Sequence, residues 1–188
     1  LLAALALLLA ALGSIYFATQ HTVLVDINGT TFEHRTHERS PGGVLRELGI
    51  VLGEGDSLDA PGEEEMLCGG PIRLTVAREV IVIHDGSVSR ARTHAASVAR
   101  AIADAGVVVF PHDRLWMLEE SCALDTPLPA PVEPIRADPK ALLAEIRRPV
   151  RLAVRRAVPL IVQDSSLRQS LHTTAQTVGE ALFENGLV

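Results

Sequence analysis

The sequence predicts an α+β protein in which small strand–strand–helix–strand (ββαβ) repeats follow an apolar N-terminal helix. Three observations predict this class. Residues 35–40 (RTHERS) and 92–97 (RTHAAS) are near copies, 57 positions apart. An Asn-Gly or Asp-Gly pair lies upstream of each copy, and a segment of alternating apolar and polar residues lies downstream. Self-similarity of this kind indicates a structural unit that is used more than once.

The composition of the 188 residues disfavours several classes of protein. A formal net charge of −6 and a pI near 5.6 are unlike a nucleic-acid-binding protein, which normally carries a basic face. Aromatic residues make up only 3% of the chain, so clefts that stack sugars or bases are disfavoured as well. Two cysteines are too few for a disulfide framework or a zinc pattern.

The first 20 residues form an apolar segment that carries no charge from Leu1 to Thr19. As a helix it would extend roughly 28 Å, close to the thickness of a bilayer core. Tyr16 and Phe17 near its end are typical of a membrane interface. An uncleaved transmembrane anchor is favoured over the apolar part of a cleaved signal peptide. A buried helix of a soluble domain is disfavoured, because the segment has no polar face at helical spacing.

The match between the two copies continues past the first six letters. Residues 40–58 align with residues 97–115, and residues 177–188 give a third copy, 80 positions after the second. Each copy predicts a short amphipathic helix, with a Ser or Thr cap at its start and a glycine at its end. The caps are Ser40, Ser97 and Thr177, and the glycines are Gly49, Gly106 and Gly186.

Strands flank each predicted helix. Upstream, residues 23–35, 80–92 and 160–172 each predict a hairpin around a short turn. The turn pairs are Asn28-Gly29, Asp85-Gly86 and the weaker Asp164-Ser165. Downstream, residues 72–78 and 150–156 alternate apolar and polar side chains, as a strand with one buried face does. A hairpin, a helix packed over it and a returning strand are the minimal form of a β-grasp, or ubiquitin-like, fold.

These elements divide the chain into a transmembrane or signal segment (1–20), two repeats (22–78 and 79–157) and a truncated third repeat (158–188). The second repeat contains a Pro-rich insertion, residues 124–149, whose second half predicts a helix capped by Asp138 with Pro139 at its first position. The apolar side of that helix is formed by Leu142, Leu143 and Ile146. A decoration packed on the repeat and a partner-binding helix are the two interpretations.

The repeats resemble the ubiquitin-like repeat of unknown function that occurs in tandem in actinobacterial resuscitation-promoting factors and related bacterial cell-surface proteins. The resemblance covers residues 22–188 and rests on the order of hairpin, capped helix, Asp-x-Leu and alternating strand. In the third copy its residues are Thr177, Val178, Gly179, Glu180, Ala181, Leu182 and Gly186. In the second copy they are Thr93, Ser97, Val98, Ile102, Gly106, Asp113 and Leu115. The first copy departs from the pattern with Pro41-Gly42 in place of a Val-Gly pair.

This resemblance implies a protein of the bacterial envelope. In such proteins an export signal or anchor comes first, tandem repeats follow, and a C-terminal domain often acts on peptidoglycan. The third repeat reaches Val188 without a returning strand. We therefore expect the natural chain to continue, with any catalytic domain in that continuation.

The sequence predicts no catalytic, cofactor-binding or metal-ligating residue. His37 and His94 occupy equivalent places in separate repeats, so a shared metal site is disfavoured. His34 faces the opposite side of its strand from His37. Asp56 and Asp113 recur once per repeat, which favours a role in a turn or cap over catalysis.

The remaining polar residues have ordinary interpretations. Glu63-Glu64-Glu65 is predicted to be a solvated loop, since it lacks the ligand spacing of a calcium site. A disulfide between Cys68 and Cys122 stays open, because sequence does not give the geometry. No serine-nucleophile motif, phosphate loop or dinucleotide fingerprint is present. We expect no enzyme and no cofactor within this chain, while the activity of a full-length protein stays open.

The expected function is that of a non-catalytic, extracytoplasmic repeat region of a membrane-anchored envelope protein, a spacer or adhesion module for a downstream cell-wall-active domain. One alternative is the N-terminal part of a peptidoglycan hydrolase, and another is a glycan- or protein-binding module. The expected partners are the membrane, through residues 1–19, and peptidoglycan or another envelope protein, but not nucleic acid. The expected location is the cell membrane, single-pass with extracytoplasmic repeats, with a secreted protein as the alternative.

Overall fold

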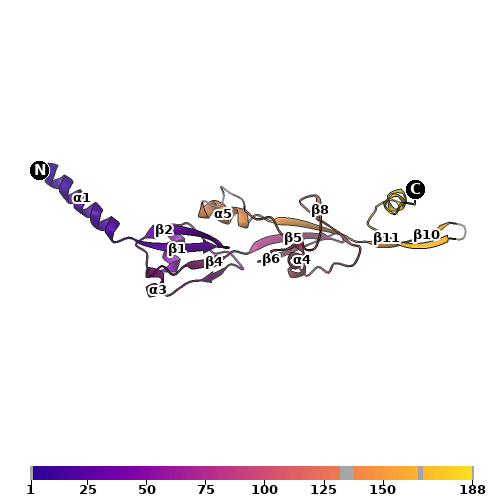
Figure 1. Cartoon of the computed structure of the whole chain (residues 1–188), viewed down its shortest axis with the longest axis horizontal. Coiled ribbons are helices and arrows are strands. Elements are labelled where there is room, and N and C mark those ends of the chain that lie inside the picture. The colour runs from indigo at the N-terminus through magenta and orange to yellow at the C-terminus, as the bar shows by residue number, and fades with distance from the viewer. Residues whose placement is uncertain (1, 132–137, 165–166, 188) are drawn as a thin grey trace. The chain divides into compact units, whose positions relative to one another are not determined.

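The computed structural model describes residues 2–131, 138–164 and 167–187 of the chain (Figure 1). Its elements form two compact units. The first consists of Leu1–Ala77 and Pro131–Ile146, and the second of Arg78–Ala130 and Arg147–Val188. Each unit has its own hydrophobic core. The predicted α+β fold with small ubiquitin-like repeats is confirmed, and the two cores correspond to the two complete repeats.

The apolar N-terminal segment, for which the sequence predicts a transmembrane helix, is helical from Leu2 to Ala18 (α1). Its exposed large side chains are Leu5, Leu9, Leu12, Tyr16 and Phe17. In the part of the chain that the structure describes, no helix combines the length and the apolarity needed to cross a membrane.

The sheet of the first unit has the strand order β2-β1-β4-β3. β1 and β2 form the predicted hairpin, and β4 returns beside β1 in parallel. Asn28 and Gly29 in the hairpin turn have φ of 49° and 84°, the left-handed conformation that this two-residue turn requires. The strands are β1 (His21–Ile27), β2 (Thr30–Thr36), β3 (Ser57–Asp59) and β4 (Ile72–Thr75). The three-residue β3 is not predicted, because it is too short to show a period.

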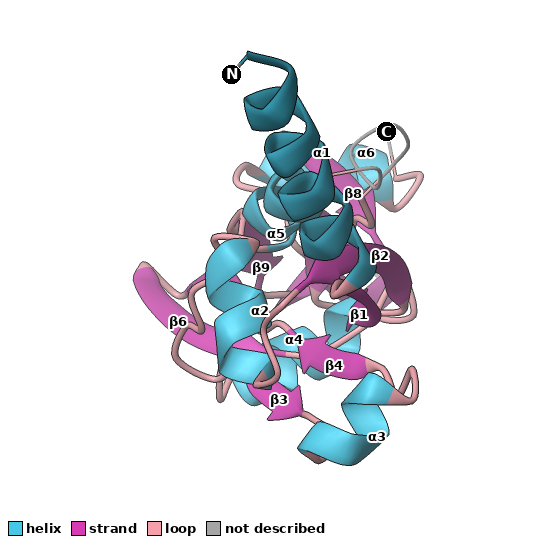
Figure 2. Ribbon diagram, turned by 90° about the vertical axis from the view of Figure 1, so that its left-hand side faces the viewer, coloured by secondary structure: helices cyan, strands magenta, loops and turns pink. Residues whose placement is uncertain are grey.

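Two helices, α2 and α3, lie between β2 and β4 in the first unit (Figure 2). α2 (Pro41–Glu47) begins as predicted, since Ser40 Oγ accepts a hydrogen bond from the N–H of Gly43 at 3.2 Å. The prediction of a solvated loop at Glu63-Glu64-Glu65 is wrong, because these residues are the first turn of α3 (Glu63–Leu67). Acidic side chains stabilise a helix at this end, and the fully buried Met66 anchors α3 to the core.

The predicted helix of the insertion is α5 (Pro139–Ile146), and Asp138 accepts a hydrogen bond from the N–H of Lys140 at 3.1 Å. The apolar side of α5 is formed by Leu142, Leu143 and Ile146, as predicted. All three are buried in the core of the first unit. A helix that lies between β8 and β9 of the second repeat in sequence therefore completes the core of the first repeat. Residues 132–137, in the Pro-rich half of the insertion, lie outside the described residues.

The second unit repeats this plan with the strand order β6-β5-β9-β7-β8. β5 and β6 form the hairpin, and β9 pairs with β5 in parallel. Its turn residues Asp85 and Gly86 have φ of 49° and 73°, as at the first hairpin. The strands are β5 (Arg78–His84), β6 (Ser87–Thr93), β7 (Arg114–Met117), β8 (Glu120–Cys122) and β9 (Val150–Arg155). β8 is an addition that has no counterpart among the strands of the first unit.

Alternate residues of the central strands fill the two cores, as the sequence pattern predicts. In the first unit these residues are Val23, Val25, Ile27, Ile72, Leu74 and Val76. In the second unit they are Val80, Val82, Val150, Leu152 and Val154. The helix that follows each hairpin also packs on its core, α2 in the first unit and α4 (Val98–Asp104) in the second.

The start of α4 differs from the prediction. Ser97 is the N-cap residue, but its side chain makes no capping hydrogen bond. The N–H groups of Val98 and Ala99 instead donate to the backbone carbonyls of Thr126 and Leu124, at 3.0 and 2.8 Å. The insertion in the second repeat therefore satisfies the helix start with its backbone, which makes a hydroxyl cap unnecessary.

The third repeat contains the hairpin of β10 (Val158–Asp164) and β11 (Leu167–Thr173), followed by α6 (Val178–Glu184). Thr177 caps α6 as predicted, by accepting a hydrogen bond from the N–H of Glu180 at 3.3 Å. Asp164 pairs with Leu167 across the turn. Ser165, the second residue of the predicted turn pair, lies outside the described residues. Among the described residues, the sheet of this repeat has two strands.

Candidate functional site

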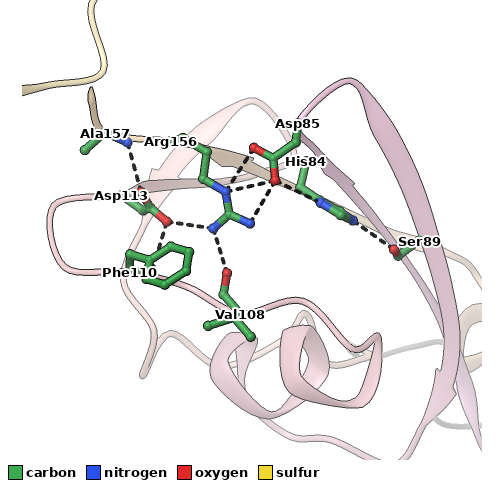
Figure 3. Close-up of polar contacts among 8 residues, drawn as sticks. All are labelled: His84, Asp85, Ser89, Val108, Phe110, Asp113, Arg156 and Ala157. Atoms are coloured by element: carbon green, nitrogen blue, oxygen red, sulfur yellow. Dashed lines mark hydrogen bonds and ion pairs between the residues drawn. The ribbon is translucent and has the colours of Figure 1, made fainter. Parts of the chain in front are cut away.

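Arg156 is the centre of a charged cluster in the second unit (Figure 3). The strand registers explain which residues meet there. His84 pairs with Val154 in the parallel β5–β9 ladder, so the turn that begins at Asp85 lies beside the residues that follow β9. Arg155 pairs with Arg114 in the antiparallel β7–β9 ladder, which brings the loop before β7 to the same place. The fold thus delivers two carboxylates, those of Asp85 and Asp113, to one guanidinium.

The guanidinium of Arg156 uses its planar set of donors on three acceptors. Nε lies 3.0 Å from both carboxylate oxygens of Asp85, and Nη2 lies 2.9 Å from Oδ2. Nη1 donates to Asp113 Oδ2 at 2.8 Å and to the carbonyl oxygen of Val108 at 2.6 Å. The ring of Phe110 lies 5.3 Å from the guanidinium carbon, within the range of a cation–π contact.

Asp113 connects this cluster to the end of the repeat. Its side chain is only 2% exposed. Oδ2 accepts from the N–H of Phe110, and Oδ1 accepts from the N–H of Ala157, both at 2.9 Å. Burial raises the pKa of this carboxyl, but the hydrogen bonds from Phe110, Ala157 and Arg156 outweigh it, so the pKa lies below its ordinary value. The carboxylate therefore stays charged and holds the chain where the second repeat passes into the third.

Asp85 forms the outer part of the cluster, and its side chain is 47% exposed. Hydrogen bonds from Arg156 and then from His84 lower the pKa of its carboxyl. His84 Nδ1 lies 3.3 Å from Asp85 Oδ2, and His84 Nε2 lies 2.9 Å from Ser89 Oγ. The hydrogen bond to Asp85 and that to Asp113 raise the pKa of Arg156 in turn.

The first repeat has a neutral arrangement at the equivalent place. Asn28 occupies the hairpin-turn position of Asp85, and Val76 occupies the position of Arg156. Asn28 Oδ1 accepts from the N–H of Val76 at 2.7 Å, and Asn28 Nδ2 donates to its carbonyl oxygen at 3.3 Å. A side-chain amide that pairs with the backbone thus replaces the ion pair of the second repeat.

One carboxylate is common to both junctions. Asp56 in the first repeat accepts from the N–H of Gly53 at 2.7 Å and from the N–H of Ala77 at 2.9 Å. Ala77 and Ala157 are the residues at which each repeat ends, before β5 and β10 respectively. The prediction that Asp56 and Asp113 act in turns or caps is confirmed, and each also fixes the exit of its repeat.

A second polar pair recurs in all three repeats. A buried threonine at the end of the hairpin bonds to a carboxylate 11 positions later, at the end of the helix. The same hydroxyl accepts the backbone N–H two residues ahead. The pairs are Thr36–Glu47, Thr93–Asp104 and Thr173–Glu184. This contact ties the hairpin to the helix, and it explains why the threonine of the RTH tripeptide recurs.

The histidines that the sequence singles out have separate surroundings. His37, after β2, contacts the end of α1, with its ring 4.4 Å from that of Tyr16. His34 Nε2 lies 3.1 Å from Glu47 Oε2, and hydrogen bonds from Thr36 and then His34 lower the pKa of Glu47. His94 is exposed after β6. Within the described ranges, no group of three or more His, Cys, Asp or Glu side chains is placed to hold a metal ion.

Both cysteines are free thiols in the structure. Cys68 is exposed at the end of α3 in the first unit, and Cys122 is half-buried in β8 of the second unit. Burial raises the pKa of the Cys122 thiol, which lowers its nucleophilicity. The disulfide that the sequence leaves open is not formed in this structure.

The sequence does not predict the central role of Arg156. Its partners are 71 and 43 positions away, so they meet only through the sheet registers. The threonine–carboxylate pairs, by contrast, have a signal in the sequence, because a threonine and an acidic residue recur at the same spacing in each repeat. What these clusters do chemically is hold turns, helix ends and repeat ends in place.

A family model described as the G5-linked-Ubiquitin-like domain matches the chain three times, at residues 23–62, 80–115 and 168–188. Together these matches cover just over half of the chain. They fall on the three repeats that the structure contains. Among curated proteins, none matches the chain significantly.

Proposed function

The chain belongs to the family of G5-linked ubiquitin-like domains, and from this premise we propose that it is a non-catalytic, extracytoplasmic part of a membrane-anchored bacterial envelope protein. In this role the repeats form a spacer and adhesion module for a cell-wall-active domain. The observation that carries the proposal is the repeated carboxylate clamp at the end of a repeat, Asp56 on Ala77 and Asp113 on Ala157.

A spacer needs each repeat to end in a defined way, because a slack junction loses the separation that the repeats provide. The buried Asp113 bonds to the last backbone N–H of its repeat, and Asp56 does the same in the first repeat. The recurring threonine–carboxylate pairs hold helix and hairpin together inside each repeat. The residues that repeat along the chain thus serve shape, which supports a structural function.

The membrane part of the proposal rests on the apolar segment 1–19. It carries no charged residue, and large apolar side chains such as Leu9 and Phe17 are exposed on α1. Exposed apolar surface of this kind favours contact with lipid. We expect the chain to be held at a membrane through this segment.

A flotation experiment tests the attachment. Residues 1–188 are expected to float with phosphatidylglycerol–phosphatidylcholine vesicles, whereas residues 21–188 are expected to stay in the dense fraction. Equal flotation of the two proteins would show that the segment does not attach the chain to the membrane.

A peptidoglycan assay tests the non-catalytic part. Residues 21–188 are expected to release no reducing sugar and no muropeptide from purified peptidoglycan, with lysozyme as the positive control. Release above the buffer blank would replace the proposal with its main alternative, a peptidoglycan hydrolase.

A further inference from the structure

The second repeat carries a basic sheet surface in an acidic chain. In its five-stranded sheet, alternate residues point away from the core and from α4. The arginines on this outer face are Arg90, Arg92, Arg114, Arg151 and Arg155. The whole chain has a formal net charge of −6, so this concentration of positive charge is local.

Two of these arginines, Arg151 and Arg155, form no ion pair with a residue that the structure describes. Arg90 and Arg114 form ion pairs, with Glu79 at 3.8 Å and with Glu184 at 3.3 Å. Arg151 forms no ion pair with any residue that the structure describes. The guanidinium of Arg155 lies 4.6 Å from the ring centroid of Trp116, as a cation–π contact. Arg155 also lies directly opposite Arg114 in the β7–β9 ladder, so two guanidinium groups share this part of the face with the carboxylate of Glu184.

A cavity of about 590 Å³ opens on the same face, and its volume is typical of a small-molecule site. Ala153, between Arg151 and Arg155 on β9, leaves the space because its side chain is small. The apolar walls are Ile83, Trp116 and Leu118, and Glu119 adds one carboxylate to the lining. Ile83 and Leu118 are 45% and 62% exposed, so their apolar surface is accessible to a ligand. The site therefore offers apolar walls with two guanidinium groups, of Arg151 and Arg155, against the single carboxylate of Glu119.

The fold itself does not require this cavity. The residue pair Trp116–Ala153 in the β7–β9 ladder corresponds to Asp59–Arg73 in the β3–β4 ladder of the first repeat. Asp59 and Arg73 form an ion pair there, at 3.6 Å. The first repeat thus has a charged pair, Asp59 and Arg73, at the two positions where the second repeat has Trp116 and the small Ala153.

We propose that this cavity binds a carboxylate-bearing polysaccharide, with one acidic pyranose unit seated over Ala153. The apolar face of a pyranose ring suits Trp116 and Ile83, and its carboxylate suits the guanidinium of Arg151 or Arg155. Nucleic acid would need several stacking rings, whereas Trp116 is the one tryptophan of the chain. A peptide strand would need free backbone groups at a sheet edge, but this site lies on a sheet face. The inference goes beyond the proposed function, because it does not depend on membrane attachment.

The fluorescence of Trp116 reports this site directly, because no other tryptophan contributes to the signal. Residues 21–188 are titrated with polygalacturonate, with neutral dextran, with poly-glutamate and with single-stranded DNA. Polygalacturonate is expected to change the emission with saturation and to bind more weakly as salt rises. Dextran is expected to cause no change. A response to poly-glutamate or DNA as strong as that to polygalacturonate would overturn the proposal, since charge alone would then suffice.

Matched substitutions localise the binding. Arg151→Gln is expected to weaken binding about tenfold, as the loss of a charge-assisted hydrogen bond does. Arg73→Gln makes the same change on the outer face of the first repeat and is expected to leave binding unchanged. Equal effects of the two substitutions would overturn the assignment of the site.

A double substitution that copies the residues of the first repeat separates a loss of binding from a loss of folding. Trp116→Asp with Ala153→Arg installs the ion pair of the first repeat at equivalent positions, so the double variant is expected to fold, as circular dichroism checks. The retention of this variant on polygalacturonate resin is expected to fall to the level of its retention on a neutral resin. Retention at the original level by the folded double variant would contradict the proposal.

Discussion

The first and second repeats place different groups at the same junction. In the first, the neutral amide of Asn28 pairs with the backbone of Val76, and in the second, Arg156 joins Asp85 and Asp113. Both solutions fix the hairpin turn to the residue before the repeat ends. The difference shows that both repeats connect the hairpin turn to the residue before the repeat end. The connection is an amide–backbone pair in the first repeat and an ion pair in the second.

The two repeats also differ in how their cores are completed. The first core includes three residues from α5, which comes from the insertion in the second repeat. The second core uses Leu128, at the start of the same insertion, and Val107 beside its own helix. One insertion thus serves both units, with its first part on one core and its last part on the other.

The largest effect is expected from removing this helix contact. Leu142→Ala leaves a cavity in the first core and is expected to cost about 3 kcal/mol of unfolding free energy. Hydrogen exchange checks where the loss falls. The amides of Val23 and Val25 are expected to lose protection, whereas those of Val80 and Val82 keep it.

The control for Leu142 is Leu118→Ala, which removes an exposed leucine and is expected to change stability by less than about 0.5 kcal/mol. Loss of protection in β5 equal to that in β1 would contradict the assignment of α5 to the first core.

A smaller effect is expected at Asp56 and Asp113, the carboxylates that bond to the last backbone N–H of each repeat. Asp113→Asn is expected to destabilise the protein by about 2 kcal/mol, because it weakens two backbone bonds and leaves Arg156 short of a buried partner. Asp56→Asn weakens the same two kinds of backbone hydrogen bond but breaks no pairing with Arg156. It is expected to cost about 1 kcal/mol. Denaturant unfolding measures both, and a larger loss at Asp56 would show that the ion pair adds nothing.

The threonine–carboxylate pair is expected to contribute less again. Thr93→Val keeps the shape but removes the hydroxyl that bonds to Asp104 and to the N–H of Ala95, which is expected to cost about 1 kcal/mol. Thr36→Val should give a loss of similar size in the first repeat. Thr31→Val, an exposed position on β2, serves as the control in the same denaturant titration. An unchanged stability in both threonine variants would remove this pair from the account.

The smallest effect is the dependence of stability on acid. The pKa values of Asp85 and Asp113 are lowered in the folded protein, so their stabilising effect is complete above the ordinary value of 3.8. It is lost as the pH falls through their folded values. Stability should therefore decline below about pH 4, and Asp85→Asn should flatten this decline. Unfolding curves between pH 7 and pH 2.5 measure it, and an unchanged slope in the variant would contradict the coupling.

Much of each repeat follows from local signals in the sequence. Asn28-Gly29 and Asp85-Gly86 set the hairpins, and the alternation in residues 72–78 sets the returning strand. These features depend on near neighbours in the chain, so their chemistry can be read without knowledge of the fold.

What the sequence does not predict depends on contacts between distant segments. The apolar side of α5 is evident, but which core has room for it is decided by the packing of the first repeat. The hydroxyl of Ser97 is a suitable cap, but the backbone of Thr126 reaches the helix start instead. Arg156 finds its partners only once the strand registers are set.

The most direct test of a shared building block is a double-mutant cycle at the junction. Asp85→Asn and Arg156→Val together recreate in the second repeat the pair that the first repeat uses. Arg156→Val leaves Asp85 without its guanidinium, and Asp85→Asn leaves Arg156 with one carboxylate, that of Asp113. The double variant is therefore expected to be more stable than the sum of the two losses. Its unfolding midpoint should also depend less on salt than that of the unsubstituted protein. A double variant at or below that sum would show that the two junctions are not equivalent and would contradict the account.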